Sequence, residues 1–246
     1  MPEGPSIVIL KEAVAIYKGK KITAVTGNSK IDQQRLLNQQ VIDFKSWGKH
    51  FLICFKGFTV RIHFLLFGSY LVDEYKDRPV RLGLSFGKGQ INLYACAVKI
   101  IEGDINDNYD FSGDVMNDTW DANKAALKLK QHPGLMVCDA LLDQDIFAGV
   151  GNIIKNEVLY RIKVHPESQV GKLPNQKQKQ LIEQARIYSF DFLEWKKQFV
   201  LKQHWQAHSK KICKRCELPM LKKITGVKKR RSFFCTKCQK LFNELS

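Results

Sequence analysis

The sequence predicts an α+β protein of two domains, in which a mainly antiparallel β domain precedes a helical domain that ends in a small hairpin. Between about residues 21 and 102, short runs rich in Ile, Val, Phe and Tyr are broken by Gly and Asn, which is typical of antiparallel strands. After about residue 122 the sequence becomes helical. Residues 213–238 then carry two Cys-X-X-Cys pairs at the spacing of a metal-bound hairpin.

Composition and charge narrow the classes of partner. The chain has 246 residues, of which 44% are hydrophobic, and this is enough for ordinary globular cores. No apolar run approaches the roughly 18 residues of a membrane span, so no membrane partner is expected. Of the formal net charge of +16, most lies after Leu201, where 13 Lys or Arg face 2 Glu. A basic segment on a rigid hairpin favours a nucleic acid, and a merely solvated basic face is the alternative.

The amino terminus begins with Met1-Pro2-Glu3-Gly4-Pro5. Ser6 is expected to cap a helix that runs to about Lys18. Proline after the initiator methionine permits removal of that methionine, which would leave a secondary amine at the chain end. Because α-amino groups have a pKa of roughly 7.7–8.0, part of such an amine is neutral and nucleophilic at physiological pH. A disordered start is the alternative.

Strands of the first domain are expected near residues 41–47, 50–56, 58–65, 68–73, 81–86, 90–95 and 97–102. The tight turn Trp47-Gly48-Lys49-His50 joins the first two. Lys49 would project from a loop on a rigid sheet, where binding and reactive residues are commonly held. An ordinary exposed turn lysine is the alternative.

The domain boundaries follow the change in composition. We predict a β domain with its leading helix at residues 1–110, a polar linker at 111–122, a helical domain at 123–209 and a hairpin at 210–246. Helices are expected at about 123–131, at 136–143, from the Gly149-Val150-Gly151-Asn152 turn to Tyr160, and within 174–203. That glycine turn exposes backbone amides where a helix begins, as phosphate sites do, although a plain interhelical turn explains it equally well.

Four cysteines predict a metal site. Cys213, Cys216, Cys235 and Cys238 suit the closed tetrahedral coordination of structural zinc. Two disulfides or unrelated thiols are the alternative, and the expected lack of a signal peptide and a reducing cytosol favour zinc. The strands expected on either side of Gly226 are too short to fold without metal. The remaining cysteines are expected to be buried thiols: Cys54, Cys96 and Cys138.

In this order and spacing, several stretches resemble the bacterial formamidopyrimidine-DNA glycosylase and endonuclease VIII superfamily of base-excision repair enzymes. The matching stretches are residues 1–5, Gly48-Lys49, Leu141 to Gln144, Gly149 to Glu157, His165-Pro166 and the cysteine hairpin. The resemblance implies an N-terminal helix packed on a β-sandwich, a helix-two-turn-helix domain around residues 136–166 and a zinc-bound hairpin. It also implies that DNA lies between the two domains.

The resemblance also implies roles for single residues. Pro2 would be the nucleophile and Glu3 the acid and base, while Lys49 would contact phosphate and assist the chemistry. Asn152 and Arg230 would grip the phosphates beside the damaged nucleotide. Arg230 is chosen over Arg231 because the family's arginine stands five residues before the third cysteine, here Cys235.

The apolar run Leu65-Leu66-Phe67 would be the wedge that fills the gap left by a flipped nucleotide, and ordinary strand burial is its alternative. Leucine at position 66 is similar to the endonuclease VIII branch. Three further features depart from guanine-lesion members: Ser6 stands where an acidic residue is common, Cys96-Ala97-Val98 replaces an arginine-bearing run, and the segment before Cys213 is short.

The implied activity is that of a bifunctional DNA glycosylase and AP lyase, which excises oxidised bases, preferably pyrimidines, through a proline imine and β,δ-elimination. Two alternatives stay open: a formamidopyrimidine or 8-oxoguanine type of glycosylase, and a non-catalytic zinc-dependent binder of damaged DNA. We expect one structural zinc ion, no organic cofactor, damaged DNA as the partner, a monomer, and a bacterial cytoplasmic location.

Overall fold

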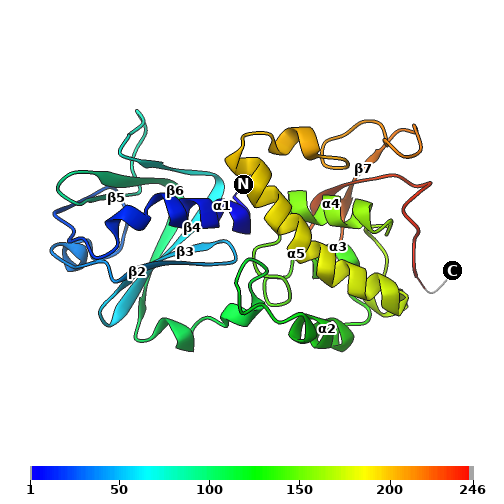
Figure 1. The fold of residues 1–246 in the computed structure, drawn as a ribbon, viewed down its shortest axis with the longest axis horizontal. Helices are drawn as coiled ribbons and strands as arrows, with labels where there is room; N and C mark the ends of the chain where they lie inside the picture. Colours follow the sequence, from blue (N-terminus) through cyan, green and yellow to red (C-terminus); the bar gives the residue numbers. More distant parts are fainter. Residues whose placement is uncertain (1, 244–246) are drawn as a thin grey trace. The chain divides into compact units, whose positions relative to one another are not determined.

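The computed structural model describes residues 2–243 and divides into two compact units (Figure 1). The N-terminal unit extends to Phe111 and the C-terminal unit begins at Ser112. The first contains an antiparallel sheet with a leading helix, and the second contains helices and a two-stranded hairpin. The predicted α+β class is therefore confirmed.

The N-terminal unit is built on one six-stranded sheet in the order β1-β5-β6-β4-β3-β2, with every neighbouring pair antiparallel. Helix α1 (Gly4–Ala13) packs against β2 and β3. Its buried Ile7 and Leu10 join the inward side chains of the strands in the main core. The strands are β1 (Ala24–Thr26), β2 (Asp43–Trp47), β3 (His50–Phe55), β4 (Phe58–Val72), β5 (Leu82–Ser85) and β6 (Gln90–Glu102).

Two long strands replace four predicted short ones. β4 and β6 pair along almost their whole lengths, whereas separate strands were expected at 58–65 and 68–73 and at 90–95 and 97–102. The pairing is interrupted once, where the four residues from Leu65 to Gly68 lie opposite Ala95. The predicted breaks between these short strands therefore correspond to a bulge, and the chain does not reverse direction there. The short strand β1 was not predicted, because three residues carry too little alternation to be recognised.

Helix α1 begins earlier than predicted. Glu3 is its N-cap residue, and Pro5 lies in the first turn, where a missing N–H has no cost. The backbone N–H of Ser6 donates to the Glu3 carbonyl at 2.8 Å, so Ser6 lies inside the helix and the prediction that it caps the helix is wrong. The helix ends at Ala13, and a 3₁₀ turn follows at Ala15–Tyr17.

The polar stretch after β6 is ordered. Ile105 and Tyr109 are each 7% exposed and pack with Leu52 on the outer face of the sheet. Further along, Asp114 accepts the N–H of Met116, and Asp121 caps the next helix by accepting the N–H of Asn123. The many Asp residues of this stretch therefore serve short turns and caps, which is the use such side chains commonly have.

Within the described residues, the C-terminal unit combines four α-helices with the hairpin. The elements are α2 (Ala122–Gln131), α3 (Val137–Ala140), α4 (Asn152–Arg161), α5 (Asn175–Lys197), β7 (Leu221–Thr225) and β8 (Arg230–Phe234). α4 packs against α3, α5 and β8, and α2 packs against α5. α3 is a single turn, shorter than predicted. The long helix stops before residue 203, because Phe199 takes a left-handed conformation with φ 62°. No described helix is both long and apolar enough to cross a membrane.

Candidate functional site

The start of α1 holds the first two predicted site residues. Glu3 is 3% exposed, and its backbone is extended (φ −115°, ψ 172°) before the helix begins. Pro2 is half-buried immediately before it. The buried carboxyl group is therefore adjacent in the chain to the pyrrolidine ring and is held by a rigid helix end. Met1 lies outside the described residues, so its predicted removal stays a prediction.

Lys49 lies where the sequence placed it. β2 and β3 are joined by the two-residue loop Gly48-Lys49, closed by the pair Trp47 and His50, and Gly48 takes φ 54°. Such two-residue hairpin loops need positive φ, which glycine adopts without strain. Lys49 is therefore half-buried at the tip of a rigid two-stranded corner.

Two histidines beside this turn were missed by the sequence reasoning. His50 and His63 are cross-strand partners in β3 and β4, with ring centroids 5.1 Å apart. Burial, followed by the charges of His63, Arg61 and Lys49, lowers the pKa of His50 to about 4. Burial, then Lys49 and Arg61, also lowers the pKa of His63. Both rings are therefore neutral at physiological pH, and the positive charges of Lys49 and Arg61 lie near them.

A cavity of about 460 Å³ in the N-terminal unit is lined in part by His50. Tyr109 borders it, and its hydroxyl lies 3.1 Å from Nδ1 of His50. Alternation along β3 and β4 could have indicated the histidines, because both occupy outward positions next to residues already singled out. The other lining residues are Trp47, Arg61, Lys99, Ile100, Ile101, Glu102 and Asn108.

The predicted wedge is exposed. Leu65, Leu66 and Phe67 are 54%, 58% and 75% exposed, because the bulge carries them out of the β4–β6 ladder. The alternative of ordinary strand burial is therefore wrong. Gly68 closes the bulge so tightly that a Cβ there would come within 2.7 Å of the Phe64 Cβ and 2.8 Å of the Ala95 carbonyl oxygen. The bulge thus has a defined shape.

In the C-terminal unit, Asn152 is the first residue of α4, and Gly151 is the N-cap. Among the residues that the structure describes, Oδ1 of Asn152 is one of few buried polar side-chain atoms without a hydrogen-bond partner. A helix N-terminus carries partial positive charge. The end of α4 can therefore receive an anion, with the Asn152 amide beside it.

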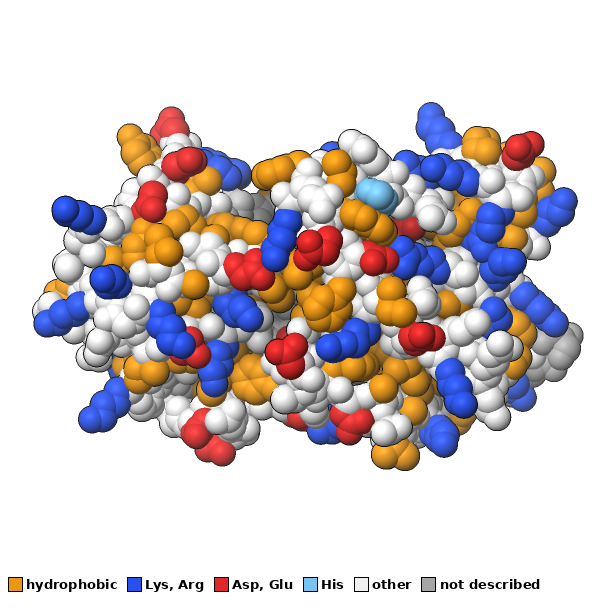
Figure 2. All heavy atoms as spheres, in the orientation of Figure 1, with side chains coloured by type: hydrophobic (Ala, Val, Ile, Leu, Met, Phe, Trp, Pro, Cys, Tyr) orange, Lys and Arg blue, Asp and Glu red, His pale blue; other side chains and the backbone are white. Residues whose placement is uncertain are grey.

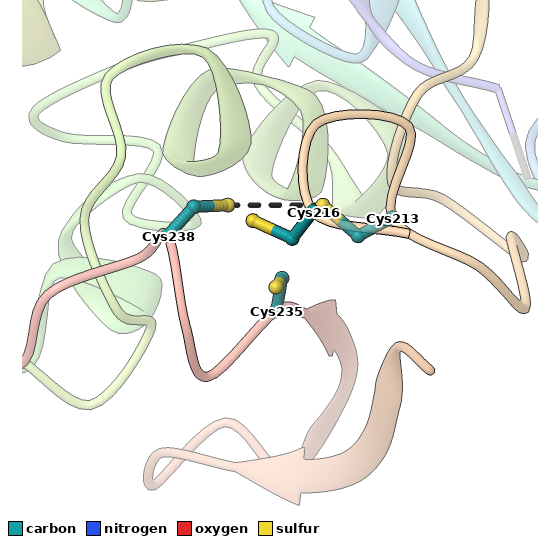
Figure 3. Close-up of side chains that lie close together, drawn as sticks. All are labelled: Cys213, Cys216, Cys235 and Cys238. Carbon is teal, nitrogen blue, oxygen red and sulfur yellow. Dashed lines mark hydrogen bonds between the residues drawn. The ribbon is translucent and has the colours of Figure 1, made fainter. Parts of the chain in front are cut away.

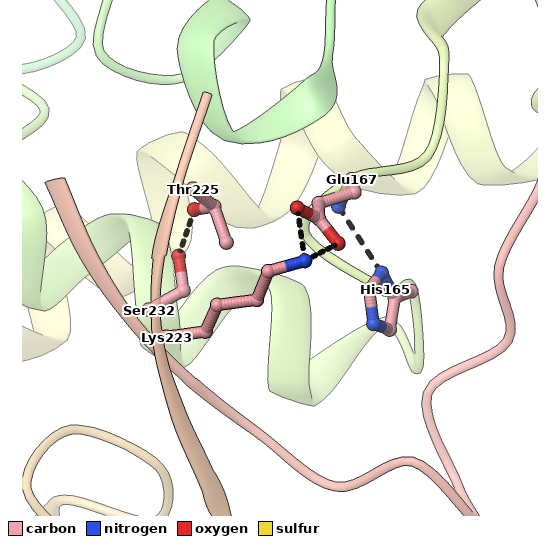
Figure 4. A network of polar contacts seen from close by, with 5 residues as sticks. All are labelled: His165, Glu167, Lys223, Thr225 and Ser232. Carbon is pink, nitrogen blue, oxygen red and sulfur yellow. Dashed lines mark hydrogen bonds and ion pairs between the residues drawn. The ribbon is translucent and has the colours of Figure 1, made fainter. Parts of the chain in front are cut away.

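The hairpin carries the basic residues. β7 and β8 pair from Leu221 with Phe234 to Thr225 with Arg230, around the turn at Gly226. Arg230 is half-buried at the start of β8, whereas Arg231 is exposed. Lys and Arg side chains gather on the surface over this hairpin (upper right in Figure 2). In the middle of β7, Lys223 pairs with both oxygens of Glu167 at 2.8 Å (Figure 4).

Three consecutive polar side chains of α4 are buried: Lys155, Asn156 and Glu157. The Lys155 ammonium group donates to the Arg231 carbonyl at 3.2 Å and to Oγ of Ser232 at 2.8 Å. Oγ of Ser232 is also 2.6 Å from Oγ1 of Thr225 across the hairpin (Figure 4). The helix therefore holds the second strand of the hairpin through its backbone.

The other two side chains continue this attachment. Oδ1 of Asn156 accepts the N–H of Phe233 at 3.0 Å, and its Nδ2 donates to the Asn152 carbonyl at 2.7 Å. The Glu157 carboxyl group accepts three backbone N–H groups, at 2.7–2.9 Å, from residues 206–208. The sequence reasoning missed these residues, since polar side chains in a helix are usually solvated. Their position between buried Ile154 and Val158 was the available signal.

The four predicted cysteines come together (Figure 3). Cys213, Cys216, Cys235 and Cys238 have all their sulfur atoms within 4.8 Å of one another, and Sγ of Cys213 lies 3.8 Å from Sγ of Cys238. The edge of a tetrahedron with metal–sulfur bonds of about 2.3 Å is about 3.8 Å. The cluster can therefore hold a metal ion. The other cysteines are buried, as predicted: Cys54, Cys96 and Cys138.

The depressed pKa of His50 predicts a stability that depends on pH. Because the unfolded chain binds this proton with a pKa near 6.5 and the folded chain near 4, the stabilisation is complete above pH 6.5 and is lost as the pH falls toward 4. The free energy of unfolding of the unmutated protein should fall when the pH is lowered from 7 to 5. In His50→Gln this fall should be smaller by about 1 kcal/mol, after allowance for screening. Urea unfolding at the two pH values measures this. The exposed His132→Gln is the control, and equal pH dependence in both variants would contradict the assignment.

Comparison with known proteins extends these observations. Residues 113–188 match the formamidopyrimidine-DNA glycosylase H2TH domain. Over 232 residues, the chain is 27% identical to Endonuclease 8-like 3 of Xenopus laevis. This match covers 89% of this chain and 38% of that protein. Over 204 residues it is 29% identical to human Endonuclease 8-like 2, covering 76% of this chain and 59% of that protein. The chain thus spans less than two thirds of these curated relatives.

Solved structures share the fold. A Lactococcus lactis formamidopyrimidine DNA glycosylase, bound non-covalently to DNA with an AP site, superposes with a TM-score of 0.85 at 20% identity, covering 97% of this chain and 99% of that one. A viral DNA glycosylase gives 0.81 at 21% identity, covering 97% and 100%. The named sequence relatives are vertebrate proteins, so the predicted bacterial origin has no support. Residues 113–188 therefore match a domain of formamidopyrimidine-DNA glycosylases, and the chain is similar in sequence to endonuclease 8-like proteins and in fold to a formamidopyrimidine-DNA glycosylase.

Proposed function

We propose that the protein is a bifunctional DNA glycosylase and AP lyase of base-excision repair, acting as a monomer on damaged DNA. The observation that carries this proposal is the arrangement at the start of α1, where a buried carboxyl group follows the half-buried Pro2 directly in the chain. A secondary amine beside a carboxyl group has both functions that the reaction needs. The similarity to formamidopyrimidine-DNA glycosylases and endonuclease 8-like proteins gives this pair its expected substrate.

Pro2 supplies the nucleophile. After loss of Met1, its nitrogen attacks the anomeric carbon of the sugar, the base leaves with the bond electrons, and an iminium ion forms between the proline and the opened sugar. The positive charge acidifies the neighbouring sugar carbon, so that proton removal expels the 3′-phosphate and a second elimination expels the 5′-phosphate. Glu3 moves the protons in these steps.

The remaining site residues bind the DNA. Lys49, Asn152 and Arg230 contact phosphates, and the exposed run from Leu65 to Phe67 enters the space left by the flipped nucleotide. Lys49 lies at the tip of the β2–β3 turn beside two neutral histidines, and this position on a rigid hairpin supports its role as a phosphate contact. The Nδ2 group of Asn152 can donate a hydrogen bond to a phosphate oxygen, and the partial positive charge at the N-terminus of α4 beside it supports a second phosphate contact there.

The four-cysteine cluster holds one structural zinc ion in this proposal, and no organic cofactor is needed. Thiolate ligands alone, arranged on two short turns, match structural zinc sites and leave no open coordination position for chemistry. The metal would stabilise the hairpin that carries Arg230. It would have no part in the reaction at Pro2.

Oxidised pyrimidines are the favoured lesions. Glycosylases that act on guanine lesions are expected to contact the opposite cytosine through an arginine-bearing run. In this chain, Cys96-Ala97-Val98 stands at the position of that run. Here β6 continues through Cys96-Ala97-Val98 as a paired strand to Glu102, so this position has no protruding loop. This supports a site with weak demands on the opposite base, although an 8-oxoguanine type of enzyme and a non-catalytic binder of damaged DNA are the alternatives that the following experiments address.

Borohydride should trap the protein on DNA that contains an abasic site or an oxidised pyrimidine, because reduction converts the imine to a stable amine. Pro2→Gly should lower trapping and strand cleavage by at least about tenfold while DNA binding persists. Pro5→Ala, which keeps the terminal amine, is the matched control. Normal trapping by a protein shown by mass spectrometry to retain Met1 would refute the mechanism, and binding without any trapping would favour the non-catalytic alternative.

Lesion preference can be measured in single turnovers on matched duplexes. Thymine glycol opposite adenine should be excised faster than 8-oxoguanine opposite cytosine, because the features that hold the guanine lesion and its partner are missing. An abasic duplex reports the lyase step alone and serves as the reference. Faster excision of 8-oxoguanine, confined to pairs with cytosine, would establish the alternative enzyme.

Metal removal should separate binding from chemistry. Metal analysis of unchelated protein should give about one zinc per chain. Cys235→Ala should lose the zinc and weaken DNA binding while leaving the proline amine reactive toward a small aldehyde and borohydride. The buried Cys138→Ala is a control that keeps all four ligands. A metal-free protein with full DNA affinity would show that the hairpin has no role in binding.

A further inference from the structure

The turn of the hairpin is held by a carboxyl group from another part of the chain. The backbone N–H groups of Val227 and Lys228 donate to the two carboxylate oxygens of Asp139, at 2.9 and 3.0 Å. Asp139 lies in α3 and is 1% exposed. Consecutive backbone amides that converge on one anion form a strong charge-assisted contact. The tip of the hairpin is therefore bound to the helical part of the unit.

Gly226 shows how closely the two parts fit. It takes φ 70°, and a Cβ at this position would lie 2.3 Å from each carboxylate oxygen of Asp139. The turn therefore needs glycine both for its conformation and for the approach of the carboxylate. A buried carboxylate whose partners are removed is costly, so this contact resists displacement.

Arg230 lies between two anchored points of the backbone. On its N-terminal side, the amide of Lys228 is bound to Asp139. On its C-terminal side, the carbonyl of Arg231 is bound to the Lys155 ammonium group. Only Lys229, with φ 48°, separates Arg230 from the residue bound to Asp139. A short two-stranded hairpin is marginally stable by itself, so these contacts determine the position of the Arg230 backbone and hence of its Cα atom.

We propose that Asp139 is a positioning residue for DNA binding, which acts through the hairpin turn to place Arg230 at its phosphate. This inference rests on the proposed function, because it takes Arg230 as a phosphate contact. Asp139 is a buried acidic residue, so it does not bind DNA itself. Its removal should nevertheless weaken DNA binding, opposite to the effect of removing an exposed acidic residue from a DNA-binding protein.

The primary test compares Asp139→Ala with Asp118→Asn, which removes the same charge at an exposed position of the same unit. Affinity is measured on a duplex with a tetrahydrofuran abasic analogue, at several salt concentrations. Asp139→Ala should bind about tenfold more weakly with a smaller salt slope, as expected when one phosphate contact is lost. Asp118→Asn should bind at least as tightly as the unmutated protein. At saturating enzyme, the single-turnover rate of Asp139→Ala should stay within about twofold.

A double-mutant cycle separates positioning from a general loss of stability. In an Arg230→Gln background, the further change Asp139→Ala should weaken binding by less than about twofold, because the group that it positions is already gone. An undiminished tenfold loss in that background would overturn the proposal. Zinc content and thermal unfolding identify a variant that fails to fold. In that case Asp139→Asn, which keeps one acceptor oxygen, takes its place with a smaller expected loss.

Hydrogen exchange tests the contact without DNA. Asp139→Ala should speed exchange at the amides of Val227 and Lys228, and should leave the amides of Glu157's partners, residues 206–208, protected. Unchanged exchange at the turn would refute the anchoring itself. Two results together would count against the proposed function: faster exchange at the turn in Asp139→Ala, and normal DNA binding by Arg230→Gln. They would show that the turn is anchored but that Arg230 does not contact a phosphate.

Discussion

Three consecutive polar residues of α4 are buried, and the arrangement of the C-terminal unit depends on the hydrogen bonds that they make. Lys155, Asn156 and Glu157 bond mainly to backbone groups of the hairpin and of residues 206–208. Each would cost free energy if it were buried without a partner, so α4 cannot keep its place unless the hairpin is in register. The hairpin, in turn, is too small to keep its shape without the helix.

The same helix connects the candidate phosphate site to the candidate metal cluster. Asn152 begins α4, and two turns later the Tyr160 hydroxyl lies 3.4 Å from Sγ of Cys213, while the Arg215 guanidinium lies 3.7 Å from the centre of the Tyr160 ring. At 1.5 Å per residue, these two ends are about 12 Å apart along a rigid axis. If the cluster holds a metal ion, its loss would therefore disturb the candidate phosphate site through the packing of α4, and not only through the hairpin strands.

Local signals in the sequence were sufficient for the features that depend on near neighbours. The Cys-X-X-Cys pairs, the loop at Gly48 and the turn at Gly226 were placed correctly, because each needs only a few residues in order. Features that depend on distant partners could not be derived. Asp139 meets its amide partners 88 and 89 residues later in the chain, and burial of Lys155 contradicts the usual exposure of lysine. Whether 58–72 forms one strand or two depended likewise on its pairing with β6.

The bulge in β4 shows how pairing can create a site instead of a core. Residues of a central strand are normally buried, yet the ladder resumes at Ser69 opposite Tyr94, so the intervening apolar side chains are excluded from it. Ala95 accepts a left-handed conformation, φ 47°, opposite the bulge, and Gly68 allows the close approach that it requires. A free protein gains little from exposing Leu66 and Phe67, since their burial would be favourable. The proposed function gives their exposure a physical reason, because an unstacked base step would be an apolar partner that buries them.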